Sequence, residues 1–396
     1  MNPVLALALL LAAGLAATRL RLPHVRRTIS LDRAMHVAAL VGAPFLLVGV
    51  LLGPALEVLD TGTLRTLTPI TALGIGWIGA VFGAQLEWRL LRRIPRGAWG
   101  IAAAQAGVVL VLTVLAARLL TRLVPALAPV WRPTIPALLT LGAVAVISGP
   151  VAVTAVARAL RVPTSMIRSL ELAALLDTAL GAVVFAFALG LSQPHRTFAG
   201  AALGWAHWVA VGTVSIGGVC VLFLWLSRFR GDASDALGLD VLAAVLVGSG
   251  LGYAADLSPF VVCALAMALI VNLSPVRRRV QTLLRSGEPT VYGLLLVALG
   301  AQLDARTLWV VPAVLVLGAI RVATRWAGTR YLRGSVGLAT VAQGAAPLAL
   351  AMSFNLTYAG SGGSLLTTVL LGVAVAEAVA APLLALALGR APVEVS

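Results

Sequence analysis

Residues 167–192 read IRSLELAALLDTALGAVVFAFALGLS, and this stretch decides the fold class. A helix needs about 20 apolar residues to cross the roughly 30 Å hydrocarbon core of a bilayer. Asp177 lies inside this run, with apolar residues on both sides of it. Ionisable residues within a span are expensive and are functional candidates by default. The stretch therefore predicts a membrane helix that carries a functional acid.

The composition of the whole chain also indicates a membrane protein. Of 396 residues, 60% are hydrophobic and 11% are charged, and the mean hydropathy is +1.03. These values exclude a soluble globular protein and a disordered chain. The net charge of +15 comes from Arg alone, in short clusters between apolar runs, so we expect no nucleic-acid partner. Cys220 and Cys263 lie in apolar runs and offer neither a disulfide framework nor a metal motif.

Thirteen apolar runs are candidate spans, which predicts an all-α membrane protein with about 13 transmembrane helices. The first run is short enough for a signal peptide, but its Arg residues follow the run instead of preceding it, so we favour a span. The runs are 3–18, 34–55, 66–86, 98–120, 134–158, 167–192, 199–227, 236–254, 258–274, 288–303, 306–326, 333–354 and 364–388.

The loops between these runs alternate in charge. Every loop that follows an odd-numbered run is rich in Arg, and the other loops are poor in it. Because Arg-rich loops stay in the cytoplasm, the N-terminus is expected outside and the C-terminus inside, in a bacterial-type inner membrane. The loops are short and 391–396 is expected to be a cytoplasmic tail, so we expect no enzyme and no cofactor. The clusters are Arg19–Arg33, Arg89–Arg96, Arg158–Arg168, Arg228–Arg230, Arg277–Arg285 and Arg330–Arg333.

A second charge shares the depth of Asp177. Arg321 and Asp177 each lie eight or nine residues from the cytoplasmic end of their span, which is roughly 12 Å. An unpaired charge at that depth would be costly, so we expect the two to form an ion pair. Arg325 lies one turn closer to the surface and is expected to extend into water. Glu377 is also deep, and for it a packing role and a functional role are equally supported.

Two runs are interrupted at about the same level, by Ser148-Gly149-Pro150 and by the stretch from Gln343 to Pro347. Pro removes a backbone donor and Gly weakens a helix, so both helices should unwind there. Matched interruptions in two halves indicate a transporter site. We expect one domain over 1–390, with an inverted repeat of 1–192 and 236–388 joined by a linker helix, 199–227.

Short motifs along nearly the whole chain resemble those of the monovalent cation:proton antiporters, the sodium/proton exchanger family. Each motif is weak alone, but their order and spacing together are specific. They are Gly49–Pro54, Ile78–Leu86, Pro150–Val153, Leu176–Gly181, Leu299–Asp304, Arg321 with Arg325 and Gly328, Gly337–Gly344 and Glu377–Leu384.

The resemblance implies two inverted repeats, a dimerisation domain, and a mobile core domain with crossed, unwound helices. It also implies that an aspartate in the sixth span carries cation and proton in alternation, and that Arg321 is the basic residue of the eleventh span. The chain departs from the family at two places. Thr178 stands where many relatives have a second acidic or ion-binding residue, and Ser148-Gly149 stands where many have Thr-Asp before the proline.

We hypothesise that Asp177 exchanges H⁺ for Na⁺ or K⁺ by alternating access in a homodimer. The hydroxyl groups of Thr178 and Ser148, with carbonyl groups freed at Gly149 and Gln343, would complete an oxygen shell. Two alternatives stay open. The same fold could move protons with another solute, or it could be a non-transporting sensor or scaffold in which the buried charges form a permanent pair.

Overall fold

The computed structural model describes residues 42–56, 59, 61–191, 197–198, 201–202, 204–229, 234–303, 305–331, 337–357 and 363–387. The predicted first span, 3–18, lies outside these residues. The described chain is helical apart from loops and one two-residue ladder between β1 (Thr197–Phe198) and β2 (Ala201–Ala202). Seven of its helices are long and apolar enough to cross a membrane, and four more are apolar but shorter.

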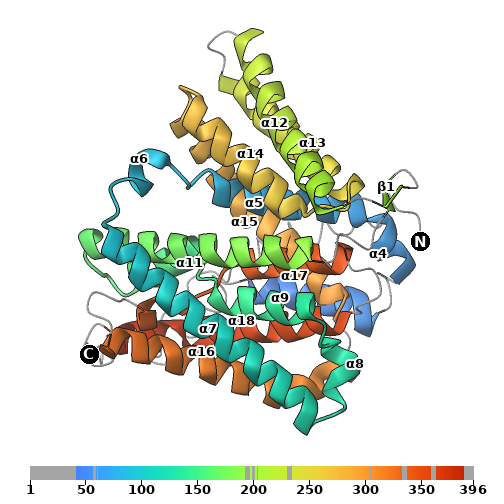
Figure 1. Cartoon of the computed structure of the whole chain (residues 1–396), viewed down its shortest axis with the longest axis vertical. Helices are drawn as coiled ribbons and strands as arrows, with labels where there is room; N and C mark the ends of the chain where they lie inside the picture. Colours follow the sequence, from blue (N-terminus) through green and yellow to red (C-terminus); the bar gives the residue numbers. More distant parts are fainter. Residues whose placement is uncertain are drawn as a thin grey trace.

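The helices form two groups that are distinct in Figure 1. The first group, whose helices α12, α13 and α14 lie at the top of the view, contains α3 (Ala43–Val50) with η1 (Leu51–Ala55), α5 (Thr68–Gly83), α12 (Trp205–Phe229), α13 (Ser234–Ala254), α14 (Pro259–Leu273) and α15 (Arg277–Ala301). The second group contains α7 (Arg96–Leu123), α9 (Ile135–Val146), α10 (Pro150–Ala159), α11 (Thr164–Gly190), α16 (Val311–Tyr331), α17 (Ala345–Thr357) and α18 (Gly363–Ala387).

Short elements join these helices. They are α4 (Thr61–Thr66), α6 (Trp88–Leu91), α8 (Leu127–Trp131), η3 (Ala305–Val310) and η4 (Gly337–Thr340). The two groups meet mainly where α17 packs against α5. A buried hydrogen bond of 2.7 Å between the hydroxyl groups of Ser353 on α17 and Ser258, the N-cap of α14, also joins them. The second group is thus attached to the first along α17.

Small residues set the helix spacing in the first group. Gly79 and Gly83 of α5 face the backbone carbonyls of Phe260 and Ala264 on α14, and a Cβ on either glycine would overlap them. Four-residue spacing of small residues lets two membrane helices approach closely, and this close packing stabilises them where lipid gives no hydrophobic drive between helices. α5 and α14 therefore form a tightly packed pair beside α17.

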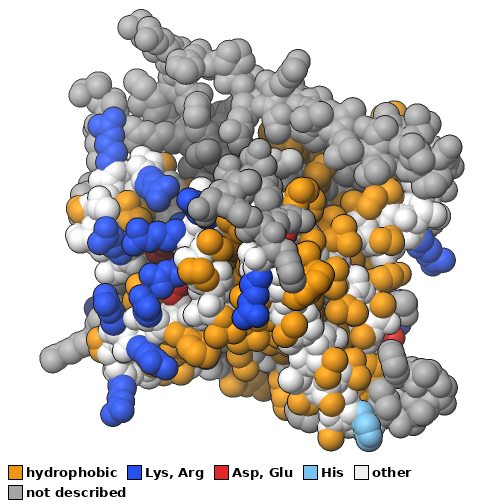
Figure 2. All heavy atoms as spheres, turned by 90° about the horizontal axis from the view of Figure 1, so that it is seen from above, with side chains coloured by type: hydrophobic (Ala, Val, Ile, Leu, Met, Phe, Trp, Pro, Cys, Tyr) orange, Lys and Arg blue, Asp and Glu red, His pale blue; other side chains and the backbone are white. Residues whose placement is uncertain are grey.

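The outer surfaces match a lipid environment. α7 exposes Leu115 (58%) and α12 exposes Val214 (73%), so large apolar side chains face outward. Figure 2 shows Arg side chains gathered at one end of the molecule, the end at which α6 lies in Figure 1, and hydrophobic side chains over much of the rest of that face. An apolar belt with arginines at one end is typical of an integral membrane protein.

Several predicted boundaries differ from those of the helices. The predicted linker helix 199–227 begins at Trp205, after β2 (Ala201–Ala202). The run 288–303 was expected to begin its helix near 288, whereas α15 begins at Arg277. Its first turns carry charge, but Val280 and Leu284 are fully buried, and Gln281 donates a hydrogen bond to the carbonyl of Ala84 (2.8 Å). These turns are amphipathic, so a count of consecutive apolar residues misses them.

Candidate functional site

The two interrupted helices touch each other at their breaks. Residues 147–149 separate α9 from α10, and residues 341–344 separate η4 from α17. The N–H of Gly149 donates to the carbonyl of Ala342 (3.0 Å). A Cβ on Gly149 would overlap the carbonyl of Gln343, and Gly344 has a φ of +66°, so both positions favour glycine. We call these two segments together the junction.

The carbonyl groups at the end of α9 all find donors, although the helix stops inside the protein. Ala143 accepts from the N–H of Ile147, and Val144 accepts from the Gln343 side chain (2.8 Å). Ala145 and Ile147 accept from Arg321, and Val146 accepts from Arg325. The last carbonyls of a helix have no partner within the helix. Side chains on α16 and on break 341–344 therefore make the interruption in α9–α10 stable.

Asp177 forms its ion pair with Arg325. Nη1 of Arg325 lies 2.8 Å from Oδ2 of Asp177, and the side chains are 1% and 8% exposed. Oδ2 also lies 2.9 Å from the hydroxyl of Ser148. Nη1 of Arg325 donates in addition to Thr340 Oγ1 (2.6 Å). Asp177 is thus buried and paired, as predicted, but by a different arginine.

The prediction that Arg321 pairs with Asp177 is wrong. Arg321 is buried and donates instead to three backbone carbonyls, those of Ala145 (2.7 Å), Val341 (2.6 Å) and Ile147 (2.8 Å). It therefore links both breaks to α16. Its guanidinium neutralises the partial negative charge of these carbonyl groups.

The prediction that Arg325 extends into water is also wrong, since this residue is 1% exposed. A helical side chain leans back over the turn on the N-terminal side of its own Cα. In α16, that direction leads from Arg325 back toward Arg321 and the junction. A depth count by residue number ignores this lean, and it therefore assigned Asp177 to Arg321 and placed Arg325 at the surface.

The hydroxyl groups of Thr178 and Ser148 bind backbone carbonyls beside Asp177. The hydroxyl of Thr178 lies 2.6 Å from the carbonyl of Ser148 and 2.9 Å from that of Ala174. The hydroxyl of Ser148 lies 2.6 Å from the carbonyl of Thr340 as well as near Asp177. Each hydroxyl has one proton, so it donates to one acceptor at a time. Both side chains have less than 1% of their surface exposed.

Glu377 of α18 holds the second break. Its Oε1 accepts from the backbone N–H groups of Gln343 (2.9 Å) and Gly344 (2.7 Å), just before α17 begins. A carboxylate is favoured at a helix N-terminus because the free N–H groups point toward it. Its Oε2 is buried and has no hydrogen-bond partner among the residues that the structure describes. The sequence signal was present, since Glu377 is a deep acid, but its contact with the break was not predictable.

A cavity of about 160 Å³ lies between the two helix groups, beside the junction. Residues of the first group on its wall include Phe82, Gln85, Glu288 and Tyr292. On the opposite wall are Gly149, Thr178, Gly344 and Glu377, whereas Asp177 is not part of the lining. Glu288, Tyr292 and Thr340 were not singled out from the sequence, because each lies near a predicted span end or in a weak motif.

A second cavity, of about 300 Å³, lies inside the second group and is mostly apolar. Arg321, Gln343, Thr113 and Thr368 contribute its polar edge. In the part of the chain that is described, no cluster of three His, Cys, Asp or Glu side chains could hold a metal ion. The charged groups that contact the junction and the adjoining end of α9 are two carboxylates, Asp177 and Glu377, and two guanidinium groups, Arg321 and Arg325.

No family model matches the chain, and no curated protein matches it by sequence. Among the solved structures that match, that of the sodium proton antiporter MjNhaP1 from Methanocaldococcus jannaschii at pH 8 has a TM-score of 0.66. The likeness covers 98% of this chain and 99% of that chain at 16% identity. At this level of identity the two chains share a fold.

Proposed function

We propose that this chain is a secondary transporter that exchanges protons for a monovalent cation, Na⁺ or K⁺, by alternating access. The observation that carries the proposal is the junction itself. Two interrupted helices meet inside the membrane-spanning region, around buried charges and next to a cavity between two helix groups. Non-helical backbone at this depth is tolerated where it is buried in protein or lines a cavity. The fold shared with a sodium proton antiporter supports the same conclusion.

The proposed architecture follows from the sequence. It has thirteen spans, the N-terminus outside and the C-terminus in the cytoplasm, and one domain over 1–390 with a tail at 391–396. Repeat 1–192 and repeat 236–388 are inverted and joined by the linker helix 199–227, and two chains form a homodimer. The arginines at one end of the molecule support this orientation (Figure 2), and the breaks, one in each half, support the repeat.

In the proposed cycle, the second helix group moves relative to the first. The cavity between them opens to one side of the membrane and then to the other, while the junction moves with the second group. The sequence makes Asp177 the first candidate for the exchanging carboxylate, with Thr178, Ser148, Gly149 and Gln343 supplying oxygen atoms. In that role its pair with Arg325 would have to open before it takes a cation, because a guanidinium stays charged and competes with the cation for the same oxygen. Glu377, the second carboxylate beside the two breaks, needs no such step.

The direct test is flux through the purified protein in proteoliposomes that contain a pH-sensitive dye. An outward gradient of Na⁺, K⁺ or Li⁺ should drive proton uptake above the level of empty liposomes. The absence of dye response to all three cations would overturn the proposal. A response to another solute alone would instead identify the same fold as a proton-coupled transporter of that solute.

One observation favours a non-transporting scaffold as a second candidate. Arg325 holds Asp177 in a fully buried pair that Ser148 and Thr340 also support. If the pair is purely structural, then removing both charges together should preserve stability and leave the phenotype unchanged. Cation-driven flux through the wild-type protein would exclude the scaffold.

A further inference from the structure

We infer that Glu377 is the carboxylate that takes the cation from the cavity and alternates between cation and proton, while Asp177 stays paired with Arg325. This inference rests on the proposed exchange function and names the site within it. The observation behind it is that the two oxygens of the Glu377 carboxyl group have different surroundings. Oε1 of Glu377 holds two backbone N–H groups, and Oε2 has no partner among the described residues, although the residue is 2% exposed.

A buried carboxylate oxygen without a partner is costly. A proton on Oε2 removes that cost by neutralising the charge, and a bound cation removes it by coordination. Both occupy the same oxygen, so one excludes the other. This mutual exclusion is what exchange requires.

Asp177 lacks this property. Its Oδ2 lies within hydrogen-bond distance of Arg325 and Ser148, and the residue does not line the cavity between the groups. A cation at Asp177 would lie next to a guanidinium that does not lose its proton in proteins. Asp177 and Arg325 therefore form a fixed pair that balances charge at the junction.

The cavity offers Glu377 the ligands that a hard cation prefers. Thr178 lies on the same wall, and Gln85, Glu288 and Tyr292 face it from the first group. Oxygen atoms of carboxylate, amide and hydroxyl groups suit Na⁺ and K⁺. Because Glu288 belongs to α15 and Glu377 to α18, movement of the two groups would separate the two carboxylates and change the site.

The test compares Glu377→Gln with Asp177→Asn. The glutamine keeps an oxygen that accepts from Gln343 and Gly344, but it removes the charge and the titratable group. Glu171→Gln is the matched control, because Glu171 is a partly exposed carboxylate that pairs with Arg285 at 3.3 Å, away from the junction. In detergent, Na⁺ or K⁺ should raise the melting temperature of the wild type, of Glu171→Gln and of Asp177→Asn, but not of Glu377→Gln.

Flux gives the second measurement. Cation-driven proton flux should fall to the level of empty liposomes in Glu377→Gln and persist in Glu171→Gln. If Glu377→Gln keeps both cation stabilisation and flux while Asp177→Asn loses them, Asp177 is the exchanging group and this inference is wrong. If the wild type shows no flux with any cation, the proposed function itself fails.

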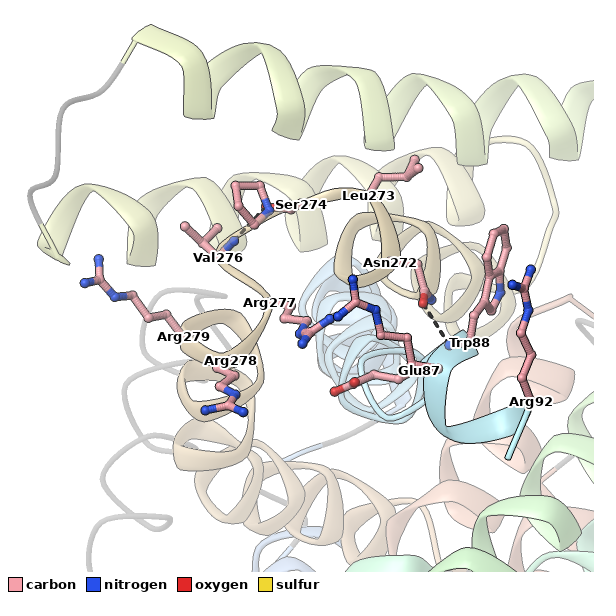
Figure 3. A pocket seen from close by; sticks show the side chains of 12 residues that line it. Glu87, Trp88, Arg92, Asn272, Leu273, Ser274, Val276, Arg277, Arg278 and Arg279 are labelled. Atoms are coloured by element: carbon pink, nitrogen blue, oxygen red, sulfur yellow. Dashed lines mark hydrogen bonds between the residues drawn. The ribbon is translucent and has the colours of Figure 1, made fainter. Parts of the chain in front are cut away.

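An independent observation concerns the arginine-rich end. A cavity of about 920 Å³ opens there between α6 and the turn from α14 to α15. Arg89, Arg92, Arg277, Arg278 and Arg279 line it, with Glu87 as the one carboxylate of the lining. In Figure 3, Arg277 lies near Glu87, Arg92 lies alongside Trp88, and Arg278 and Arg279 point away from Glu87. None of the five forms an ion pair with a described residue.

Hydrogen bonds connect the two walls of this cavity. Asn272 accepts from the N–H of Trp88 (2.8 Å) and donates to the carbonyl of Leu86 (2.8 Å). Glu87 accepts from Gln281 of α15 (2.6 Å). The side chains of Trp88 (51%) and Leu273 (59%) are exposed at its rim. Tryptophan beside arginine is typical of the membrane–water interface.

We propose that this cavity binds the phosphate headgroup of an anionic phospholipid. Basic pockets between membrane helices on the cytoplasmic side bind such headgroups, and arginine forms bidentate hydrogen bonds with phosphate. The exposed apolar side chains at the rim favour a lipid over a free phosphate, because they would contact acyl chains. A lipid here would join α6, which leads into the second helix group, to α14 and α15 of the first.

The experiment measures the melting temperature in nanodiscs of phosphatidylcholine with and without phosphatidylglycerol. The anionic lipid should stabilise the wild type and the control Arg158→Gln/Arg168→Gln, whose exposed arginines do not line the cavity. The double variant Arg89→Gln/Arg277→Gln should lose this stabilisation. Full retention in that variant would overturn the proposal, and so would equal stabilisation of the wild type by inorganic phosphate without anionic lipid.

Discussion

At the scale of single residues, the junction depends on which atom each charge meets. Asp177 was recognisable from the sequence because it is a lone acid in an apolar run. Its partner was not, because residue numbers give the depth of a Cα and not the reach of a long side chain. Arg321 and Arg325 differ by one turn, yet one binds only carbonyl groups and the other binds the acid.

Removing one member of the buried pair should be more harmful than removing both. Arg325→Met leaves Asp177 as an uncompensated buried charge and should destabilise the protein by about 3–5 kcal/mol. Arg325→Met combined with Asp177→Leu should recover most of that loss. Thermal unfolding in detergent measures both variants. Equal destabilisation by the single and double variants would show that the pair does not couple the two sites.

Gly149→Ala should disrupt the contact between the breaks. The added Cβ would overlap the carbonyl of Gln343, and strain of this kind costs about 1–3 kcal/mol. Gly100→Ala on α7 is the control, because a Cβ there meets no other atom within 4 Å. The melting temperature and cation-driven flux should both fall in Gly149→Ala and stay unchanged in Gly100→Ala. An unchanged melting temperature and unchanged flux in Gly149→Ala would mean that the close contact between Gly149 and Gln343 does not contribute to stability or transport.

At the scale of elements, the spans were largely predictable and their ends were not. Twelve of the thirteen predicted runs overlap a described helix, although β2 (Ala201–Ala202) lies within the run 199–227, and the first run lies outside the described residues. The interruptions were predictable because Ser148-Gly149-Pro150 cannot continue a regular helix. The early start of α15 was not, because its first turns combine three consecutive arginines with only two buried apolar residues, Val280 and Leu284. Glu377 was visible as an acid, but its contact with break 341–344 joins segments 33 and 34 residues apart.

Arg321 acts on whole elements, since it connects the end of α9 and break 341–344 to α16. Arg321→Lys should leave some of its three carbonyl acceptors without a donor, because an ammonium group cannot reproduce the planar fork of a guanidinium. We expect a loss of about 1–3 kcal/mol for each carbonyl left unsatisfied. Hydrogen exchange should rise in peptides that cover 141–150.

The control for that experiment is Arg330→Lys, near the end of α16, where the arginine lies over Trp326. Exchange in 141–150 should not change there. Equal protection of 141–150 in the wild type and in Arg321→Lys would remove Arg321 from the support of the break.

At the scale of the whole molecule, the charge distribution predicts its orientation. In a background without Cys220 and Cys263, a cysteine at Arg93 should react with a membrane-impermeant maleimide only in inverted vesicles. A cysteine at Val124, at the other end of α7, should react only in intact cells. Both expectations follow from the excess of arginine on the cytoplasmic side. The reverse pattern would place the arginine-rich end, and its cavity, outside.

The packing of helices against one another was the least predictable feature from the sequence. Local patterns identify spans and breaks, but they do not state which helices become neighbours. The pairing of α5 with α14 brings together residues far apart in the chain, through glycines that look alike in every span. The cavity between the groups has walls from both halves, so no single motif contained it.

The two oxygens of Glu377 have one mechanical consequence. Oε1 holds the start of α17, and α17 is the helix that packs against α5 of the other group. Hydrogen bonds to an ionised acceptor are roughly twice as strong as those to a neutral one. Protonation of Oε2 would therefore weaken the hydrogen bonds that Oε1 accepts at the start of α17, the helix that connects the two groups. Loss of the proton would strengthen these hydrogen bonds again. Loading state and domain motion would then be coupled through a single side chain, with no relay of intermediate residues.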